Sequence, residues 1–359
     1  MQIRRGRGAL SNEGSRYLPT RSEWLDDERA DNGWAVDEIV DAGCALETRL
    51  LADRTVRLIT RNRSPDIPFD RSINPFKGCE HGCVYCFARP THAYLDLSPG
   101  LDFETRIFYK TGVRERLQAE LSHPGYQVQP IALGTNTDPY QPAEKQLRVT
   151  REILELLLEW RHPLTIVTKS QLILRDLDLL EEMARMHLVQ VHLSVTTLSN
   201  DLKVKLEPRT ASPAARLRTV RALSEAGVPA GVMVAPVIPF INDAEMEAII
   251  AAGVAAGARR FGYILLRLPL EVAPLFEEWL DTHYPLKKTR VLNAVRQTRG
   301  GRLYDAAWGT RMTGRGEIAQ LLQNRFRHAL RKQGIDAGGF DAALRSDLFS
   351  HPGYQASLF

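Results

Sequence analysis

Between residues 72 and 283, short apolar runs alternate with longer segments in which apolar residues recur every three or four positions. The first pattern predicts buried strands and the second predicts amphipathic helices. The predicted strands cover 72–76, 130–137, 164–169, 189–195, 230–237 and 261–266. The predicted helices cover 113–121, 147–160, 175–186, 213–226, 243–256 and 271–283.

This alternation gives six strand–helix units, which are typical of an α/β fold with a parallel sheet buried on both faces. Two architectures fit the pattern, a doubly wound open sheet and a whole or partial barrel. No G-x-G-x-x-G sequence follows the first predicted strand, which counts against a dinucleotide-binding fold.

The two ends of the chain differ from this central part. Residues 1–70 are polar and irregular, apart from a predicted strand at 56–60, and we expect them to form an N-terminal extension. We expect a core domain over 71–285 and a basic, helical C-terminal region over 286–359. No apolar run approaches the ~18 residues of a membrane span, and the basic N-terminus lacks the apolar core of a signal peptide, so we expect a cytoplasmic protein.

Three of the four cysteines follow the first predicted strand, as Cys79, Cys83 and Cys86 in a C-x3-C-x2-C arrangement. Gly78 and Gly82 precede two of them and allow backbone conformations that other residues avoid. Sulfur ligands favour zinc, copper(I) or an iron–sulfur cluster. Three cysteines without a fourth nearby indicate a metal centre with an exposed coordination position, and such a position is typical of a reactive site.

Two other interpretations of the cysteines remain open from the residues alone. A zinc site would use the three cysteines with His81 or His92 as the fourth ligand. A disulfide with a spare thiol fits poorly with a chain that has no secretion signal. Cys44 lies among apolar residues far upstream, where we expect a buried structural thiol.

The C-x3-C-x2-C spacing with a following aromatic residue, Phe87, resembles the signature of the radical S-adenosylmethionine (SAM) superfamily. The resemblance implies that the cysteines bind three irons of a [4Fe–4S] cluster and that SAM chelates the fourth. It also implies reductive cleavage of SAM to a 5′-deoxyadenosyl radical that abstracts hydrogen from a substrate. The implied fold is a partial (β/α)6 TIM-type barrel, whose active site would lie at the C-terminal ends of the strands.

Polar residues at the predicted strand ends narrow the resemblance to the branch that contains spore photoproduct lyase and DNA repair photolyase-like proteins. It covers residues 71–268. It implies that Lys169 binds the SAM carboxylate and that Ser194 binds the ribose. It further implies that residues 135–137 contact the SAM amino group and that the Phe87 backbone binds the adenine. The implied cofactor-binding residues are therefore Phe87, Thr135, Asn136, Thr137, Lys169 and Ser194.

The sequence departs from this branch at the end of the second strand. The lyase has a cysteine there that returns hydrogen to the product radical, whereas this chain has Gly134 and no cysteine beyond residue 86. Among Tyr85, Tyr94 and Tyr140, we take Tyr85 as the candidate hydrogen donor, because it lies within the cysteine motif.

Two further contacts are predicted around the site. We expect a salt bridge between Glu207 and Arg209, which belong to a Glu-Pro-Arg sequence that recurs in this branch. We also expect Arg89 to reach a backbone carbonyl or a substrate phosphate.

The net charge of +4 is unevenly distributed. Residues 287–332 contain twelve lysines or arginines against two acids, with Tyr304, Trp308 and Phe326 among them. Such a segment is either a solvated helical face or a surface that binds nucleic acid. In the second case Arg299, Arg302 and Arg311 would contact phosphates.

Two functional hypotheses follow from the sequence. The first is a radical SAM enzyme that uses a [4Fe–4S] cluster and SAM, receives electrons from a flavodoxin- or ferredoxin-like partner, and acts on an unidentified substrate, with nucleic acid as one candidate. The second is a zinc-stabilised protein that binds nucleic acid without catalysis. Lys169 and Ser194 separate the two, because a zinc site uses neither.

Overall fold

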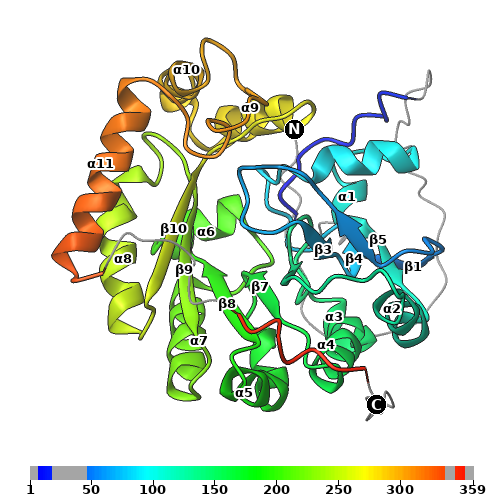
Figure 1. Cartoon of the computed structure of the whole chain (residues 1–359). Helices are drawn as coiled ribbons and strands as arrows, with labels where there is room; N and C mark the ends of the chain where they lie inside the picture. The colour runs from blue at the N-terminus through cyan, green and yellow to red at the C-terminus, as the bar shows by residue number, and fades with distance from the viewer. Residues whose placement is uncertain (1–6, 18–46, 336–343, 352–359) are drawn as a thin grey trace, which may run out of the picture.

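The computed structural model describes residues 7–17, 47–335 and 344–351, and its central feature is a seven-stranded sheet (Figure 1). The strand order is β10-β9-β8-β7-β6-β3-β2. Neighbours from β3 to β10 are parallel and follow chain order, whereas β2 pairs antiparallel with β3 at one edge. The strands are β2 (Ile59–Arg61), β3 (Arg71–Ile73), β6 (Ile131–Leu133), β7 (Leu164–Thr168), β8 (Val189–Ser194), β9 (Ala230–Val237) and β10 (Arg260–Leu265).

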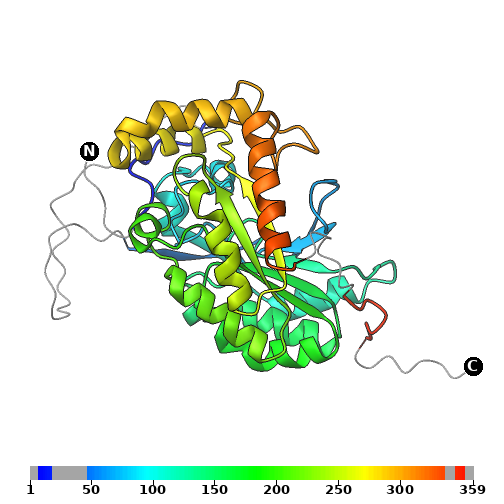
Figure 2. The same cartoon turned by 90° about the vertical axis from the view of Figure 1, so that its left-hand side faces the viewer.

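Helices follow the parallel strands and cover the outer face of the sheet (Figures 1 and 2). Six parallel strands in sequential order confirm the predicted α/β pattern. The helices from α2 onward are α2 (Val113–Leu121), α3 (Glu144–Leu147), α4 (Val149–Glu159), α5 (Leu177–Arg185), α6 (Asn200–Leu206), α7 (Pro213–Glu225), α8 (Met246–Ala255), α9 (Val272–His283), α10 (Lys288–Thr298) and α11 (Glu317–Lys332). Short 3-10 helices are η1 (Arg89–Leu95), η2 (Gln171–Asp176), η3 (Asp243–Glu245) and η4 (Pro285–Lys287).

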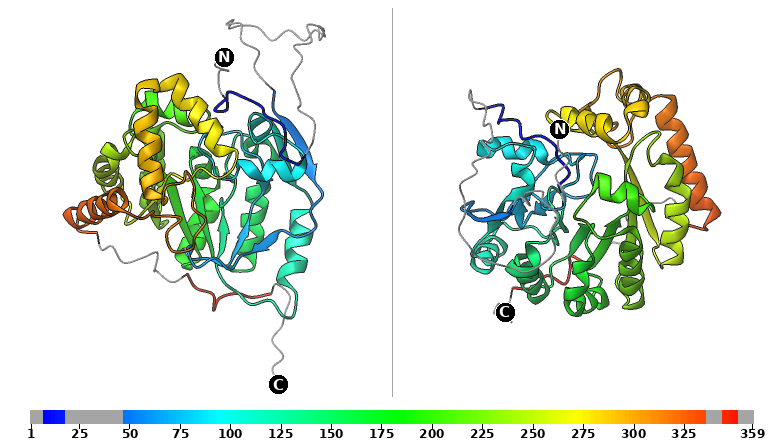
Figure 3. Two further views of the ribbon diagram at one scale, coloured as in Figure 1. Left: turned by 90° about the horizontal axis from the view of Figure 1, so that it is seen from above. Right: turned by 180° about the vertical axis from the view of Figure 1, so that it is seen from behind.

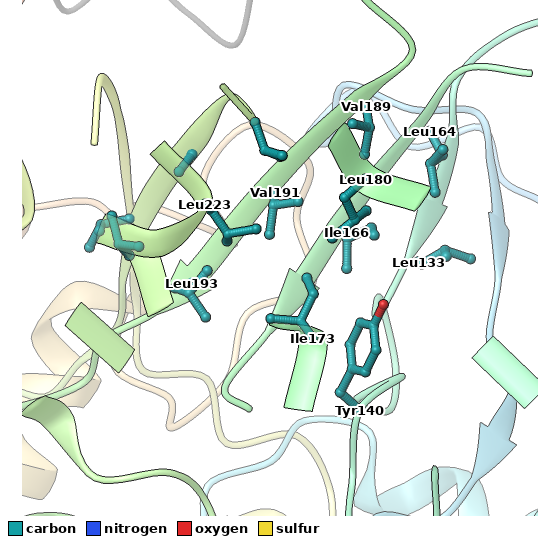
Figure 4. Packing of buried hydrophobic residues seen from close by; sticks show 14 of the residues in the cluster. Leu133, Tyr140, Leu164, Ile166, Ile173, Leu180, Val189, Val191, Leu193 and Leu223 are labelled. Atoms are coloured by element: carbon teal, nitrogen blue, oxygen red, sulfur yellow. The ribbon is translucent and has the colours of Figure 1, made fainter. Parts of the chain in front are cut away.

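The main core lies between the sheet and these helices (Figure 4). All six residues of β8 are buried, as expected for a parallel strand covered on both faces. Leu180 of α5 and Leu223 of α7 pack in the same cluster as Val191 and Leu193 of β8. This packing fixes where each strand ends, and therefore fixes the positions of the polar residues beyond the strand ends.

A second, three-stranded sheet was not predicted. It has the order β1-β5-β4, with β1 (Arg49–Asp53), β5 (Arg106–Lys110) and β4 (Phe76–Lys77). The predicted first strand, 72–76, is therefore divided between the two sheets, because the chain leaves β3 at Ile73 and pairs again at Phe76. Residues before 71 thus contribute β1 to one sheet and β2 to the other.

Helix boundaries also differ from the sequence pattern. The predicted helix at 147–160 begins as α4 after Arg148, whose positive φ of 54° separates it from α3. The predicted helix at 175–186 is preceded by η2, which starts where the Ser170 hydroxyl accepts a hydrogen bond from the Leu172 amide. Periodicity detects the apolar face of a helix but not these changes of backbone direction.

The C-terminal region packs in two places. Helix α11 runs beside α8, whereas residues 344–351 lie under the N-terminal ends of the central strands (Figures 1 and 3). There the Ser350 amide donates to the Trp160 carbonyl and the Arg345 amide donates to the His187 carbonyl. Among the described residues, no helix is long and apolar enough to cross a membrane. Cys44 lies outside the described residues.

Candidate active site

The three motif cysteines lie in one loop after β4, at the C-terminal edge of the parallel sheet. Gly78 and Gly82 have positive φ values of 80° and 66°, as the sequence predicts for this tight loop. The Cys79 amide donates to the Phe103 carbonyl at 2.8 Å, and the Cys86 amide donates to the Cys83 carbonyl at 3.2 Å. Backbone bonds therefore hold both ends of the loop.

The three thiols are free and converge. Cys86 packs against the cluster of buried residues that contains Cys79 and against the one that contains Cys83. Burial raises the pKa of Cys83 to about 12 and raises that of Cys79 well above its usual range. Thiolates at these positions thus need a compensating positive charge, which the irons of a cluster supply. The donor set therefore fits an iron–sulfur cluster.

The histidines of the zinc alternative face other groups. His81 Nδ1 lies 3.3 Å from Asp138 Oδ2, and His92 Nε2 contacts the Arg106 carbonyl at 3.0 Å. Over the part of the chain that the structure describes, no three His, Cys, Asp or Glu side chains are arranged to hold a single metal ion. Cluster ligands each bind a different iron and need no such common centre. The site therefore does not support the zinc alternative.

A buried carboxylate joins the cysteine loop to the N-terminal segment, residues 7–17. Glu104 lies in α1 (Asp102–Thr105) and accepts hydrogen bonds from the amides of Gly8 and Ala9 at 3.0 and 2.8 Å. Its other partner is Arg89 Nη2 at 2.5 Å, and Arg89 also donates from Nε to the Cys83 carbonyl. The prediction that Arg89 reaches a backbone carbonyl is thus confirmed.

Lys169 follows β7, and among the described residues its ammonium group has no hydrogen-bond or ion-pair partner; its backbone amide donates to Asp138. Burial alone would lower its pKa, but the nearby Cys83 and Glu207 outweigh burial and raise it. A half-buried, charged ammonium beside the cysteine loop is suited to an anionic ligand. The carboxylate of SAM is such a ligand.

Ser194 ends β8, the strand next to β7, and its side chain is buried. In the described part of the chain its hydroxyl makes no hydrogen bond, since only its carbonyl is engaged, by Arg216 Nη1 at 2.8 Å. Lys169 and Ser194 therefore present two uncommitted polar groups at the ends of adjacent strands.

Unlike the side chains of Lys169 and Ser194, the polar residues after β6 form hydrogen bonds within the protein. Thr135 exchanges hydrogen bonds with the Asn74 side chain, at 3.1 and 3.2 Å, and the Asn136 amide donates to the same side chain at 2.9 Å. The buried Thr137 hydroxyl donates to the Phe76 carbonyl at 2.8 Å. Of the three side chains, that of Asn136 is exposed, so we expect it to be the most accessible to a ligand.

The predicted salt bridge between Glu207 and Arg209 is wrong. Glu207 is fully buried and pairs with Arg216 of α7, whereas Arg209 pairs with Glu80 at 3.2 Å. Burial disfavours the charged form of Glu207, but Arg216 and Lys169 outweigh it and lower the pKa to about 2. Glu207 therefore carries a negative charge, which together with the larger effect of Cys83 raises the pKa of Lys169.

Tyr85 is buried, and its hydroxyl donates to the Glu207 carboxylate. The same carboxylate oxygen accepts a hydrogen bond from Thr196 Oγ1 at 2.6 Å. Burial raises the pKa of Tyr85 well above its usual range, so the phenol stays protonated. Its O–H bond points at Glu207, which favours a structural role over hydrogen donation.

Gly134, at the position of the hydrogen-donating cysteine implied by the resemblance, has no room for a side chain. Its φ is 83°, and a Cβ there would lie 2.1 Å from the Val167 carbonyl oxygen. The backbone of β7 therefore excludes any thiol at this position.

The basic residues predicted to contact phosphates are mostly committed within the protein. Arg299 is buried and donates to four backbone carbonyls, those of Leu265, Leu266, Thr310 and Arg311. Arg311 pairs with Asp66 at 2.5 Å. Phe326 belongs to the core, whereas Arg302 and Trp308 are exposed. The prediction for Arg299 is therefore wrong.

Sequence reasoning missed Glu104, Arg216 and the pair of His81 with Asp138. His81 and Asp138 are 57 positions apart, and Glu104 binds Gly8 from 96 positions away, so spacing carried no signal for these contacts; Arg216 and Glu207 are only nine positions apart but lie on different elements. One signal was present: buried Asp138 follows the polar residues after β6, where its carboxylate accepts from Thr168 Oγ1 and the Lys169 amide at 2.7 Å each.

Comparison with known proteins agrees with this geometry. A sequence model described as the Radical SAM superfamily matches residues 73–252, half of the chain. An uncharacterized protein of Mycobacterium tuberculosis is 39% identical over 221 residues, 61% of this chain and 65% of that protein. An uncharacterized protein of Methanocaldococcus jannaschii is 28% identical over 213 residues, 59% of this chain and 76% of that protein. The chain thus spans slightly less than two thirds of the mycobacterial relatives that it matches.

Solved structures show the same fold. Spore photoproduct lyase complexed with dinucleoside spore photoproduct aligns with a TM-score of 0.58 and 17% identity, over 79% of each chain. A variant of that lyase with bound AdoMet and dinucleoside spore photoproduct aligns with a TM-score of 0.58 and 16% identity, over 79% of this chain and 78% of that one.

Proposed function

Because this chain belongs to the radical SAM superfamily, whose members use a [4Fe–4S] cluster and SAM, we propose that Cys79, Cys83 and Cys86 bind the cluster and that Lys169 and Ser194 bind SAM. The observation that carries this assignment is the pair of uncommitted polar groups, the Lys169 ammonium and the Ser194 hydroxyl, on adjacent strand ends beside the cysteine loop. When bound, the cluster and SAM supply the electron and the 5′-deoxyadenosyl radical for hydrogen abstraction.

The protein's own residues position and shield these groups. Lys169 would bind the SAM carboxylate, and the nearby Cys83 and Glu207 raise its pKa. Ser194 would donate to the ribose, Asn136 with Thr135 and Thr137 would border the amino group, and the Phe87 backbone would border the adenine. The loop backbone, fixed through Arg89 and Glu104, would hold the three thiolates in place.

We extend the proposal to a nucleic-acid substrate and a small redox partner. The likeness in fold to a lyase solved with a dinucleoside photoproduct supports the first part, as do the exposed Trp308 and Arg302. A flavodoxin- or ferredoxin-like donor in the cytoplasm would supply the electron. The reaction would differ from that of the lyase in the step that returns hydrogen, because Gly134 leaves no room for a cysteine.

Anaerobic reconstitution followed by reduction in the presence of SAM tests the assignment. About four irons per chain and release of 5′-deoxyadenosine are expected. The Cys83→Ala variant should bind less iron than wild type and should release no 5′-deoxyadenosine. Release of 5′-deoxyadenosine by that variant at the wild-type rate would contradict the proposed ligand set.

A further inference from the structure

Two arginines stack on aromatic rings beyond the ends of β9 and β10. The Cζ atom of Arg267 lies 4.3 Å from the centroid of the Phe87 ring. The Cζ atom of Arg290, in α10, lies 3.9 Å from the centroid of the Phe240 ring. A guanidinium stacked in this way is held in orientation while its N–H edge stays open to a ligand.

Neither guanidinium is neutralised. Within residues 7–17, 47–335 and 344–351, the side chains of Arg267 and Arg290 form no hydrogen bond or ion pair, and each stacks on one aromatic ring. Arg290 is exposed, and an exposed arginine commonly has no partner within the protein. Arg267, in contrast, is half-buried. Burial has the largest effect on the pKa of Arg267 and lowers it; Tyr304 opposes burial, Arg311 lowers the pKa further, and Cys86 and Asp66 also raise it.

The surroundings of Arg267 make this lack of a counter-ion informative. Arg299, directly after α10, is also buried but is satisfied by four carbonyls, and Arg311 is satisfied by Asp66. Arg267 is thus a half-buried cation whose side-chain donors bind no other described residue. An anionic ligand is the group that best compensates such a cation.

The position of Arg267 places that ligand next to the reactive centre. Phe87, under its guanidinium, directly follows the cluster ligand Cys86. Arg267 itself follows β10, so it lies at the same edge of the sheet as Lys169 and Ser194. Lys169 and Ser194 are assigned to SAM, which leaves Arg267 for a different anion.

We propose that Arg267, with Arg290 as a second contact, binds backbone phosphates of a nucleic-acid substrate. Planar guanidinium groups match phosphate oxygens two at a time. Two such groups, one after β10 and one in α10, fit a ligand with more than one phosphate, and the exposed Trp308 offers a surface on which a base can stack. This inference deepens the proposed function and rests on it.

Binding of a short fluorescein-labelled single-stranded DNA of mixed sequence to the anaerobic holoenzyme tests the proposal, with inorganic pyrophosphate as competitor. Fluorescence anisotropy over a salt series gives the affinity and its salt dependence. For Arg267→Gln we expect binding about tenfold weaker and a salt slope smaller by about 0.7, the value for one phosphate contact to a single strand. Arg267→Lys should keep the slope and lose part of the affinity.

Arg221→Gln is the matched control, because Arg221 is exposed on α7 and should leave both affinity and slope at wild-type values. Iron content reports whether each variant is folded. Wild-type affinity and slope in Arg267→Gln would overturn the proposal, as would a wild-type enzyme that binds pyrophosphate but no DNA.

A separate measurement keeps this inference apart from the proposed function. If the wild-type enzyme releases 5′-deoxyadenosine but binds no DNA, the phosphate site is wrong and the radical SAM assignment stands. If it binds DNA through Arg267 but never cleaves SAM, the proposed function is wrong and the phosphate site stands.

Discussion

Arg89 and Glu104 form an ion pair with 2.5 Å between Nη2 and Oε1, and neither side chain is exposed to solvent. The pair connects the carbonyl of Cys83, a proposed cluster ligand, to the amides of Gly8 and Ala9. Residues far apart in the chain thereby form one support under the cysteine loop. The N-terminal segment thus packs against the core beside the cysteine loop.

A side chain added at Gly8 should disturb this support. A Cβ on Gly8 would lie 1.7 Å from the Gly82 carbonyl oxygen, inside the cysteine loop. Gly8→Ala should therefore displace the N-terminal segment and lower the iron bound after reconstitution, whereas Gly125→Ala, whose Cβ would meet its neighbours at 3.4 Å or more, should not. Equal iron content in the two variants would show that the cluster does not depend on this contact.

Glu104→Gln tests the contribution of the Glu104 charge to the same support. The substitution leaves Arg89 buried without a counter-ion, which costs about 3–5 kcal/mol. We expect a matching loss in the free energy of unfolding, measured by urea titration of the anaerobic protein. A loss below about 1 kcal/mol would mean that the pair is not as buried as described.

Substitution of Gly134 tests whether a side chain, and hence a cysteine thiol, fits at this position. Gly134→Ala combines a strained φ with a backbone clash at Val167, whereas Gly301→Ala has a similar φ of 88° and open space around its Cβ. We expect Gly301→Ala to cost about 1 kcal/mol in the free energy of unfolding and Gly134→Ala to cost several times more. Similar stability of the two variants would mean that a side chain, and hence a thiol, fits after β6.

The sequence predicted the parallel strands and the cysteine loop because both depend on local patterns. Apolar runs mark buried strands, and the short spacing of Cys79, Cys83 and Cys86 forces their convergence. Lys169 and Ser194 could be placed because Lys169 follows β7 and Ser194 is the last residue of β8, and the ends of parallel strands meet at one edge of a sheet.

Contacts that depend on packing were not predictable in this way. Glu207 and Arg209 are two positions apart, and this proximity favoured the prediction of a salt bridge between them. In the structure Glu207 pairs with Arg216, and Arg209 pairs with Glu80. Glu104 and Gly8 are 96 positions apart, and no local pattern links them. The basic segment predicted Arg299 to be a surface charge, but the residue is buried and donates to carbonyls at the end of β10 and between α10 and α11.

The role of Tyr85 can be tested by comparing its substitution with that of Thr196, because the hydroxyls of both residues donate to Glu207. If Tyr85 is structural, Tyr85→Phe and Thr196→Val should each destabilise the protein by about 1–3 kcal/mol and lower 5′-deoxyadenosine release to a similar extent. Thermal unfolding and SAM-cleavage assays measure both effects. A Tyr85→Phe protein of wild-type stability that has lost turnover would instead support the predicted hydrogen-donor role.

Buried histidines should make the fold sensitive to acid. Burial lowers the pKa of His162 to about 4, below the 6.5 of a free imidazole. Between these values the unfolded chain binds a proton that the folded chain does not, so stability falls as the pH drops, by up to ~1.4 kcal/mol per pH unit. Urea titrations across this range should show a shallower slope for His162→Gln than for wild type, and equal slopes would contradict the assignment.

The proposed binding of SAM by Lys169 should be detectable in the EPR spectrum of the reduced cluster. In the wild-type enzyme, addition of SAM should change the cluster signal. In Lys169→Ala the iron content should match wild type, but the same SAM concentration should leave the signal unchanged, whereas Lys145→Ala, at an exposed position on α3, should respond as wild type does. A Lys169→Ala enzyme whose signal shifts at the wild-type SAM concentration would contradict the account.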